Sequence, residues 1–121
     1  MIKEAYVSFE IARLLKEKNF NEACEHQYYV IDKKLGTYNT TDRSRNPERY
    51  IDAPTHQMVM AWLRKKGWHI TIDCIDVTET GLVFTIKIVD MKSFFEYKIG
   101  YDSTYEKAVE SALKYCFEKV I

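Results

Sequence analysis

The fold is decided by residues 68–102, which read WHITIDCIDVTETGLVFTIKIVDMKSFFEYKIGYD. Apolar residues alternate with polar ones over three runs: 68–74, 82–89 and 95–101. Alternation with a period of two is typical of a β-strand that buries one face. The polar stretches TETG and DMKS between the runs are turn sequences. We therefore predict a three-stranded antiparallel meander with one apolar face, in which the phase slip at Ile75 and Val77 marks a bulge or a strand end.

Three segments with helical periodicity flank this meander and the region before it. The first runs from Phe9 to about Lys18 behind Ser8 as N-cap, with Asn19 closing it in a left-handed conformation. The second is predicted over 54–66, with Pro54 at the first helical position and Gly67 as terminator. The third follows Ser103-Thr104-Tyr105-Glu106, which has the pattern of a capping box with Ser103 as N-cap.

The region between the first two helices is predicted to contain an N-terminal hairpin. Residues 27–31 read QYYVI, which favours a strand, and a turn at Asp32-Lys33-Lys34 would return the chain through residues 35–38. We therefore predict an α+β fold in which three amphipathic helices cover the meander and the hairpin. It would be a two-layer sandwich, or a three-layer one if the second face of the sheet is also covered. No linker or repeat divides residues 1–121, so we predict a single domain.

Composition and charge exclude several classes of protein. Lys and Arg number 18 against 18 Asp and Glu, and the halves 1–60 and 61–121 each carry nine charges of either sign, so no global attraction to a polyanion is encoded. No apolar run approaches the ~20 residues that cross a bilayer, and no signal peptide is recognisable. The three cysteines do not suggest a disulfide framework, and we expect Cys74 and Cys116 to be buried and reduced. A cytoplasmic location and no membrane partner are the resulting expectations.

The sequence shows no assembled reaction centre. Cys24 and His26 could pair with His56 and Cys74, but structural zinc sites usually contain two tight ligand pairs. A Cys–His–carboxylate arrangement around Cys24 lacks any local signature, and the four isolated glycines form no phosphate-binding loop. We therefore predict that the protein is not an enzyme and carries no metal or cofactor.

One segment has the composition of a binding surface. Residues 33–49 hold five cations against two acids, and tyrosines flank them. Arginines beside exposed aromatics can anchor a protein interface or grip a nucleic acid; a solvated loop with half-packed tyrosines is the simpler interpretation. The candidate binding residues are Tyr28, Tyr29, Tyr38, Arg43, Arg45, Arg49 and Tyr50.

Three stretches of the chain resemble a family of small proteins of unknown function that bacteriophages and prophages of gut bacteria encode. They are residues 6–18 (YVSFEIARLLKEK), residues 53–64 (APTHQMVMAWLR) and residues 105–116 (YEKAVESALKYC). The chain is similar, more weakly, to phage domains built as sandwiches of helices and sheet. The resemblance implies an α+β phage accessory protein and transfers no catalytic residue, and residues 24–49 depart from it.

Two functions therefore compete. The first is a non-enzymatic interaction module that contacts an unknown protein partner or a second copy of itself. The second is nucleic-acid binding through residues 33–49. A small enzyme that uses Cys24 or a histidine is a weaker third hypothesis.

Overall fold

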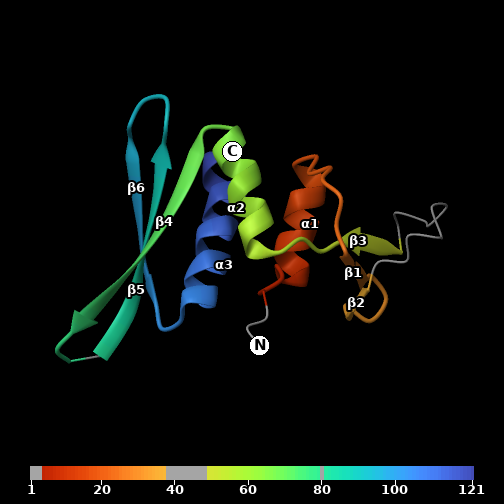
Figure 1. Cartoon of the computed structure of the whole chain (residues 1–121), viewed down its shortest axis with the longest axis horizontal. Coiled ribbons are helices and arrows are strands. Elements are labelled where there is room, and N and C mark those ends of the chain that lie inside the picture. Colours follow the sequence, from red (N-terminus) through yellow and green to blue (C-terminus); the bar gives the residue numbers. More distant parts are fainter. Residues whose placement is uncertain (1–3, 38–48, 80) are drawn as a thin grey trace. The chain divides into compact units, whose positions relative to one another are not determined.

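A computed structural model describes residues 4–37, 49–79 and 81–121. These residues form an α+β fold with three α-helices, as predicted, and two three-stranded antiparallel sheets where a meander and a hairpin were expected (Figure 1). The helices are α1 (Phe9–Glu17), α2 (His56–Lys65) and α3 (Tyr105–Tyr115), and α3 continues into a π-helical turn, η1 (Cys116–Val120). The strands are β1 (His26–Tyr29), β2 (Leu35–Thr37), β3 (Tyr50–Asp52), β4 (Trp68–Val77), β5 (Gly81–Asp90) and β6 (Glu96–Asp102).

The chain divides into two compact units, residues 1–56 and residues 57–121. Unit 1 holds α1 and the sheet β2-β1-β3, and unit 2 holds the sheet β4-β5-β6 with α3 and nearly all of α2. The single domain and the number of layers stay predictions.

Helix α1 of unit 1 forms where the sequence predicts it. The Ser8 hydroxyl accepts a hydrogen bond from the Ile11 N–H at 3.2 Å, and Asn19 takes the left-handed conformation with φ 62°. Ile11, Ala12 and Leu15 are buried at helical spacing. Burial of this stripe, rather than intrinsic helix propensity, supplies most of the stability of so short a helix.

The sheet of unit 1 contains a strand that the sequence analysis missed. β1 pairs antiparallel with β2 on one side and with β3 on the other, with Tyr28 opposite both Leu35 and Ile51. Strand β3 spans only three residues, too few to display an alternating pattern, so its pairing with β1 was not readable from the sequence.

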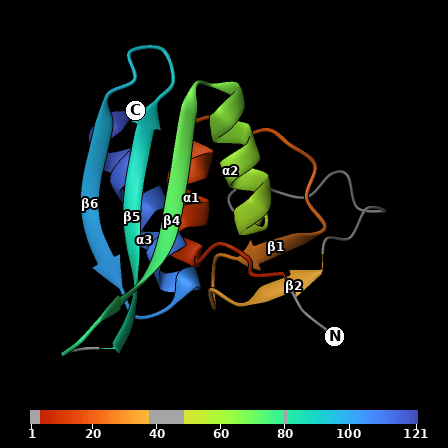
Figure 2. The same ribbon diagram turned by 60° about the vertical axis from the view of Figure 1, so that its left-hand side comes forward.

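In unit 2 the meander forms as predicted. β4 and β5 pair over ten residues and β6 joins the other edge of β5 (Figure 2). Ile70 lies opposite Ile88 and Ile72 opposite Ile86, which places these side chains on one face. The apolar stripe of α3 covers that face, with Ala108, Val109, Ala112 and Leu113 all fully buried.

Two helix starts differ from the prediction. Helix α2 begins at His56 instead of Pro54, because the Pro54 carbonyl accepts the Val7 N–H at 3.0 Å and Thr55 forms a β-bridge with Tyr6, which keeps this stretch extended. The N-cap of α3 is Thr104 instead of Ser103; its hydroxyl accepts the Lys107 N–H at 3.1 Å.

Two predictions about the sheet were also wrong. β4 continues without a bulge to Val77, so Ile75 and Val77 lie on the face opposite to Ile70 and are 43% and 36% exposed. The register shift instead falls in the β5–β6 pairing, where Lys98 and Gly100 pair with consecutive residues of β5. Cys74, expected to be buried, is exposed on the edge strand β4, whereas Cys116 is fully buried.

Candidate functional site

Of the seven candidate binding residues, four lie within the described part of the chain. Tyr38, Arg43 and Arg45 lie outside the described residues. Tyr28 and Tyr29 lie on β1, Tyr50 begins β3, and Arg49 precedes it.

Tyr28 ties the sheet of unit 1 to the residues that lead into α1. Its hydroxyl donates a hydrogen bond of 2.6 Å to the Val7 carbonyl, and its ring meets the edge of the Phe9 ring with centroids 5.6 Å apart. The side chain is half-buried. These contacts give Tyr28 a role in holding unit 1 together.

Tyr29 and Tyr50 form an aromatic pair on the opposite face of this sheet. They are register partners, and their rings meet edge to face with centroids 5.3 Å apart. The Tyr29 ring also lies over Gly36, where an added Cβ would sit only 2.6 Å from it. The exposed Arg49 adjoins the pair, and its carbonyl accepts the Val30 N–H at 2.8 Å. Binding by this group stays a prediction.

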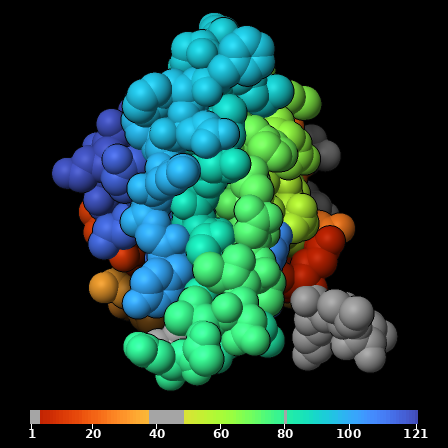
Figure 3. Space-filling view, turned by 90° about the vertical axis from the view of Figure 1, so that its left-hand side faces the viewer, coloured from red at the N-terminus to blue at the C-terminus, as the bar shows by residue number. Residues whose placement is uncertain are grey.

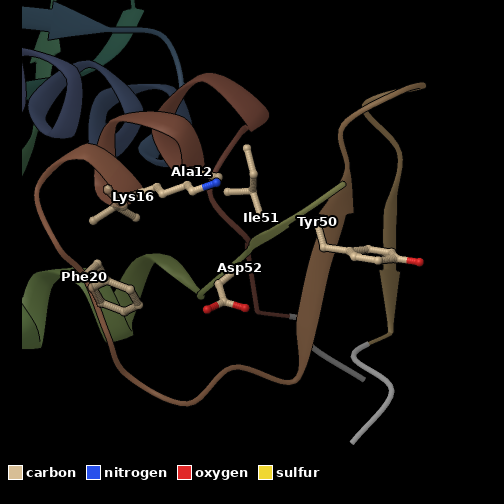
Figure 4. A pocket seen from close by; sticks show the side chains of 7 residues that line it. Ala12, Lys16, Phe20, Tyr50, Ile51 and Asp52 are labelled. Carbon is tan, nitrogen blue, oxygen red and sulfur yellow. The ribbon is translucent and has the colours of Figure 1, made fainter. Parts of the chain in front are cut away.

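Unit 1 also contains a shallow pocket between α1 and β3 (Figure 4). Its volume is about 110 Å³, whereas sites for metabolites usually enclose at least ~300 Å³. The lining is mostly apolar, with Lys16 and Asp52 as charged members: Ala12, Leu15, Lys16, Phe20, Tyr50, Ile51 and Asp52. The pocket is therefore too small for a metabolite-sized ligand.

Within residues 4–37, 49–79 and 81–121, no group of three or more His, Cys, Asp or Glu side chains is placed to hold a metal ion. Cys24 lies on a loop and forms no disulfide; its Sγ–H donates a hydrogen bond to the Glu22 carbonyl at 3.4 Å. Nor do the helices of this described part include one long and apolar enough to cross a bilayer.

The loop between β5 and β6 carries a different kind of surface, which the sequence analysis did not select. We call Met91, Lys92, Ser93, Phe94 and Phe95 the β5–β6 tip. Its apolar members Met91, Phe94 and Phe95 are 47%, 80% and 58% exposed. The tip projects at the upper end of the sheet face that Figure 3 shows.

The backbone of the tip is held by a set of short hydrogen bonds. Phe94 N–H donates to the Asp90 carbonyl at 2.7 Å, and Asp90 N–H donates to the Phe95 carbonyl at 2.9 Å. The Asp90 carboxylate accepts the Lys92 N–H at 3.0 Å, and the Met91 N–H reaches the Gly67 carbonyl at 2.9 Å. The loop is thus fixed both to itself and to the turn between α2 and β4.

Phe94 occupies a backbone conformation that disfavours it. Its φ of 63° lies in the left-handed region, where the Cβ of an L-residue crowds the backbone at a cost of ~1 kcal/mol. The phenyl ring gains little from burial in return, since 80% of the residue is exposed. Strain that is not offset by packing is characteristic of functional positions.

Exposed cations occur in the tip itself and in the segment to which it is hydrogen-bonded. Arg64, Lys65 and Lys66 are exposed in the last turn of α2 and just after it, and the methylene chain of Lys92 runs beside Gly67. The Lys66 ammonium lies over the Trp62 ring, 4.7 Å from its centroid.

The carboxylate of Asp90 is part of the turn and stays ionised there. A hydrogen bond from the backbone N–H of Lys92 is the main cause that lowers the pKa of Asp90 below its usual 3.8.

A sequence signal for the tip did exist. Phe94 and Phe95 are adjacent, and neighbouring residues at a strand end point to opposite sides. One of the two rings therefore had to lie off the apolar face of the meander.

No family model, no curated protein and no solved structure matches this chain.

Proposed function

We propose that the protein is a non-enzymatic interaction module that binds another protein through the β5–β6 tip. The single observation that carries the proposal is Phe94, a large aromatic residue that is strained in its backbone and exposed in its side chain. A fold selected for stability alone would favour Gly or Asn at such a position. Contact of the ring with a partner would offset the cost.

The neighbours of Phe94 support a protein interface. Met, Phe and Tyr are enriched at the centres of interfaces, and Met91 and Phe95 add two further exposed apolar side chains to the same loop. The ring of Phe95 packs against Tyr97 with centroids 4.8 Å apart, and Tyr97 in turn lies 6.4 Å from Trp68. These ring contacts restrict the motion of Phe95, so less conformational entropy is lost when a partner binds the tip.

The biological setting belongs to the same proposal. The resemblance to phage and prophage proteins suggests an accessory protein that acts in the cytoplasm of a bacterial host, without a cofactor and away from the membrane. A second copy of the chain is the alternative partner.

The test compares Phe94→Asn with the matched control Ile31→Asn. Both residues are exposed apolar turn residues, at 80% and 91%, and Asn tolerates the left-handed conformation. Partners captured from host lysate would be identified by mass spectrometry, purified and titrated calorimetrically against the three proteins. We expect the Phe94 variant to lose at least ~30-fold in affinity, as for an interface hot spot, and the control to bind like the parent.

Equal binding by the Phe94 variant and the parent protein would refute the proposed site, and a parent protein without any specific partner would refute the function. Light scattering after gel filtration tests for self-association. If the parent protein is a dimer and the Phe94→Asn variant is a monomer, the partner is a second copy of the chain.

Nucleic-acid binding through residues 33–49 is the alternative function. The observation in its favour is the half-exposed pair Tyr29–Tyr50 beside Arg49. It predicts a salt-dependent gel shift that the triple change Arg43→Ala, Arg45→Ala and Arg49→Ala abolishes. The absence of any shift at low salt would contradict it.

A further inference from the structure

We infer that the partner of the β5–β6 tip presents an acidic surface around an apolar pocket that receives Phe94. This inference rests on the proposed function and adds the chemistry of the partner. It follows from the charges near the tip, from the state of the nearby carboxylates and from the exposure of Phe94 on a loop that projects from the end of the sheet.

The charge beside the tip is predominantly positive. Residues 64–67 and 90–96 contain four cations, Arg64, Lys65, Lys66 and Lys92, against the two carboxylates of Asp90 and Glu96. All four cations are exposed. The hydrogen bond between Met91 N–H and the Gly67 carbonyl joins the two segments, so the four cations belong to stretches of chain that meet at the tip.

Both carboxylates are already engaged within the chain. Asp90 accepts the Lys92 N–H at 3.0 Å and belongs to the turn itself. Glu96 lies 3.5 Å from the Lys87 ammonium on the neighbouring strand. The four exposed cations still outnumber these two carboxylates, and carboxylates placed on the partner would complement them.

The same two carboxylates favour a protein over a polyanion. A nucleic-acid backbone or an anionic bilayer presents negative charge over the whole contact and would have to approach Asp90 and Glu96 as well. A protein places its charges singly and can avoid them. Hot spots of protein–protein interfaces also commonly have an aromatic side chain at the centre and charged residues at the rim.

A displayed library of random peptides is the probe for this inference. It would be selected on the whole protein and counter-selected on Phe94→Asn. We expect enriched peptides to combine an apolar core with Asp or Glu and to bind severalfold more weakly at ~300 mM than at ~50 mM NaCl, because salt screens exposed charge pairs. Lys92→Gln should weaken their binding by about 1.5- to fivefold, the range for one exposed ion pair.

Lys107→Gln is the matched control for Lys92→Gln. Lys107 is also an exposed lysine of unit 2, but it lies in the first turn of α3, which begins where β6 ends and not at the β5–β6 loop (Figure 1). This variant should bind the selected peptides like the parent protein.

The possible failures separate the two proposals. Enriched peptides without acidic residues, or binding that is insensitive to salt and to Lys92→Gln, would overturn the acidic partner and leave the tip as a docking site. Failure to enrich any peptide that requires Phe94 would overturn both. Binding of vesicles of phosphatidylglycerol and phosphatidylcholine, or of single-stranded DNA, that is lost in Phe94→Asn would overturn the assignment to a protein.

Discussion

Phe94 and Asp90 show how single residues shape the β5–β6 tip. Phe94 holds the left-handed position that closes the loop onto the Asp90 carbonyl, and the Asp90 carboxylate caps the Lys92 N–H inside the same turn. The turn is therefore well specified by Asp90, whereas Phe94 is an unfavourable residue for its own backbone conformation. This contrast is the residue-scale reason to assign the tip a function.

Replacing Phe94 by Gly should stabilise the protein. Glycine adopts a positive φ without the Cβ clash, so we expect the free energy of unfolding to rise by about 0.5–1 kcal/mol, measured by urea denaturation. Phe95→Gly, at a neighbouring position without a positive φ, is the control and should not stabilise. Loss of stability in Phe94→Gly would show that the ring makes a net packing contribution.

The titration of Asp90 should show the lowered pKa directly. The carboxylate signal in NMR should titrate below the usual 3.8, because the Lys92 N–H bond favours the charged form. The pKa of Asp90 is lower in the folded state than in the unfolded state. The ionised carboxylate therefore makes its full contribution to stability above pH ~4, and this contribution is lost as the pH falls through the folded-state pKa. The stability difference between the parent protein and Asp90→Asn should shrink over that range, and a difference independent of pH would contradict this account.

At the scale of elements, the start of α3 depends on one hydroxyl. Thr104 has extended backbone angles, φ −131° and ψ 157°, and its side chain caps the Lys107 N–H. Thr104→Ala should therefore cost about 1 kcal/mol of unfolding free energy, whereas Ser103→Ala should cost a few tenths at most. Thermal denaturation of the two variants shows which of the two neighbouring hydroxyls caps the helix. A larger loss of stability in Ser103→Ala than in Thr104→Ala would mean that Ser103 is the N-cap.

The central strand β5 contributes buried side chains to the core of unit 2. Ile88 is fully buried between Ile70 on β4 and Tyr97 on β6. Ile88→Ala should destabilise the protein by about 2–5 kcal/mol through lost burial and the cavity it leaves. Leu82→Ala, on the same strand but 63% exposed, should cost less than about 1 kcal/mol in the same denaturation assay. Equal losses would mean that the sheet lacks the packed face described above.

At the scale of the whole molecule, the two units differ in how much sheet each contains. Strands of unit 1 span three or four residues, while those of unit 2 span seven to ten. Long central strands generally contain the amides that exchange most slowly. We expect hydrogen exchange to be slowest in β5 and faster in β2 and β3, and the reverse order would contradict this division of stability.

Calorimetry addresses the number of domains. A single cooperative transition would support the single domain that the sequence predicts, and two separate transitions would show that residues 1–56 and 57–121 unfold independently.

The sequence by itself determined the three helices and the long meander, because residues such as Ile70, Ile88 and Leu113 repeat with the periods of a strand or a helix and each period reports burial directly. The tertiary structure alone decided what depends on partners distant in sequence: the three-residue strand β3, the extended stretch at Pro54 held by Val7, and the exposure of Cys74 on an edge strand. The tip belongs to the second group. An adjacent Phe pair is visible in the sequence, but the folded chain is needed to show that Phe94 has a strained backbone and an exposed side chain. The folded chain also shows that the tip is joined to the α2–β4 turn, because that contact depends on the hydrogen bond from Met91 to Gly67 across the fold.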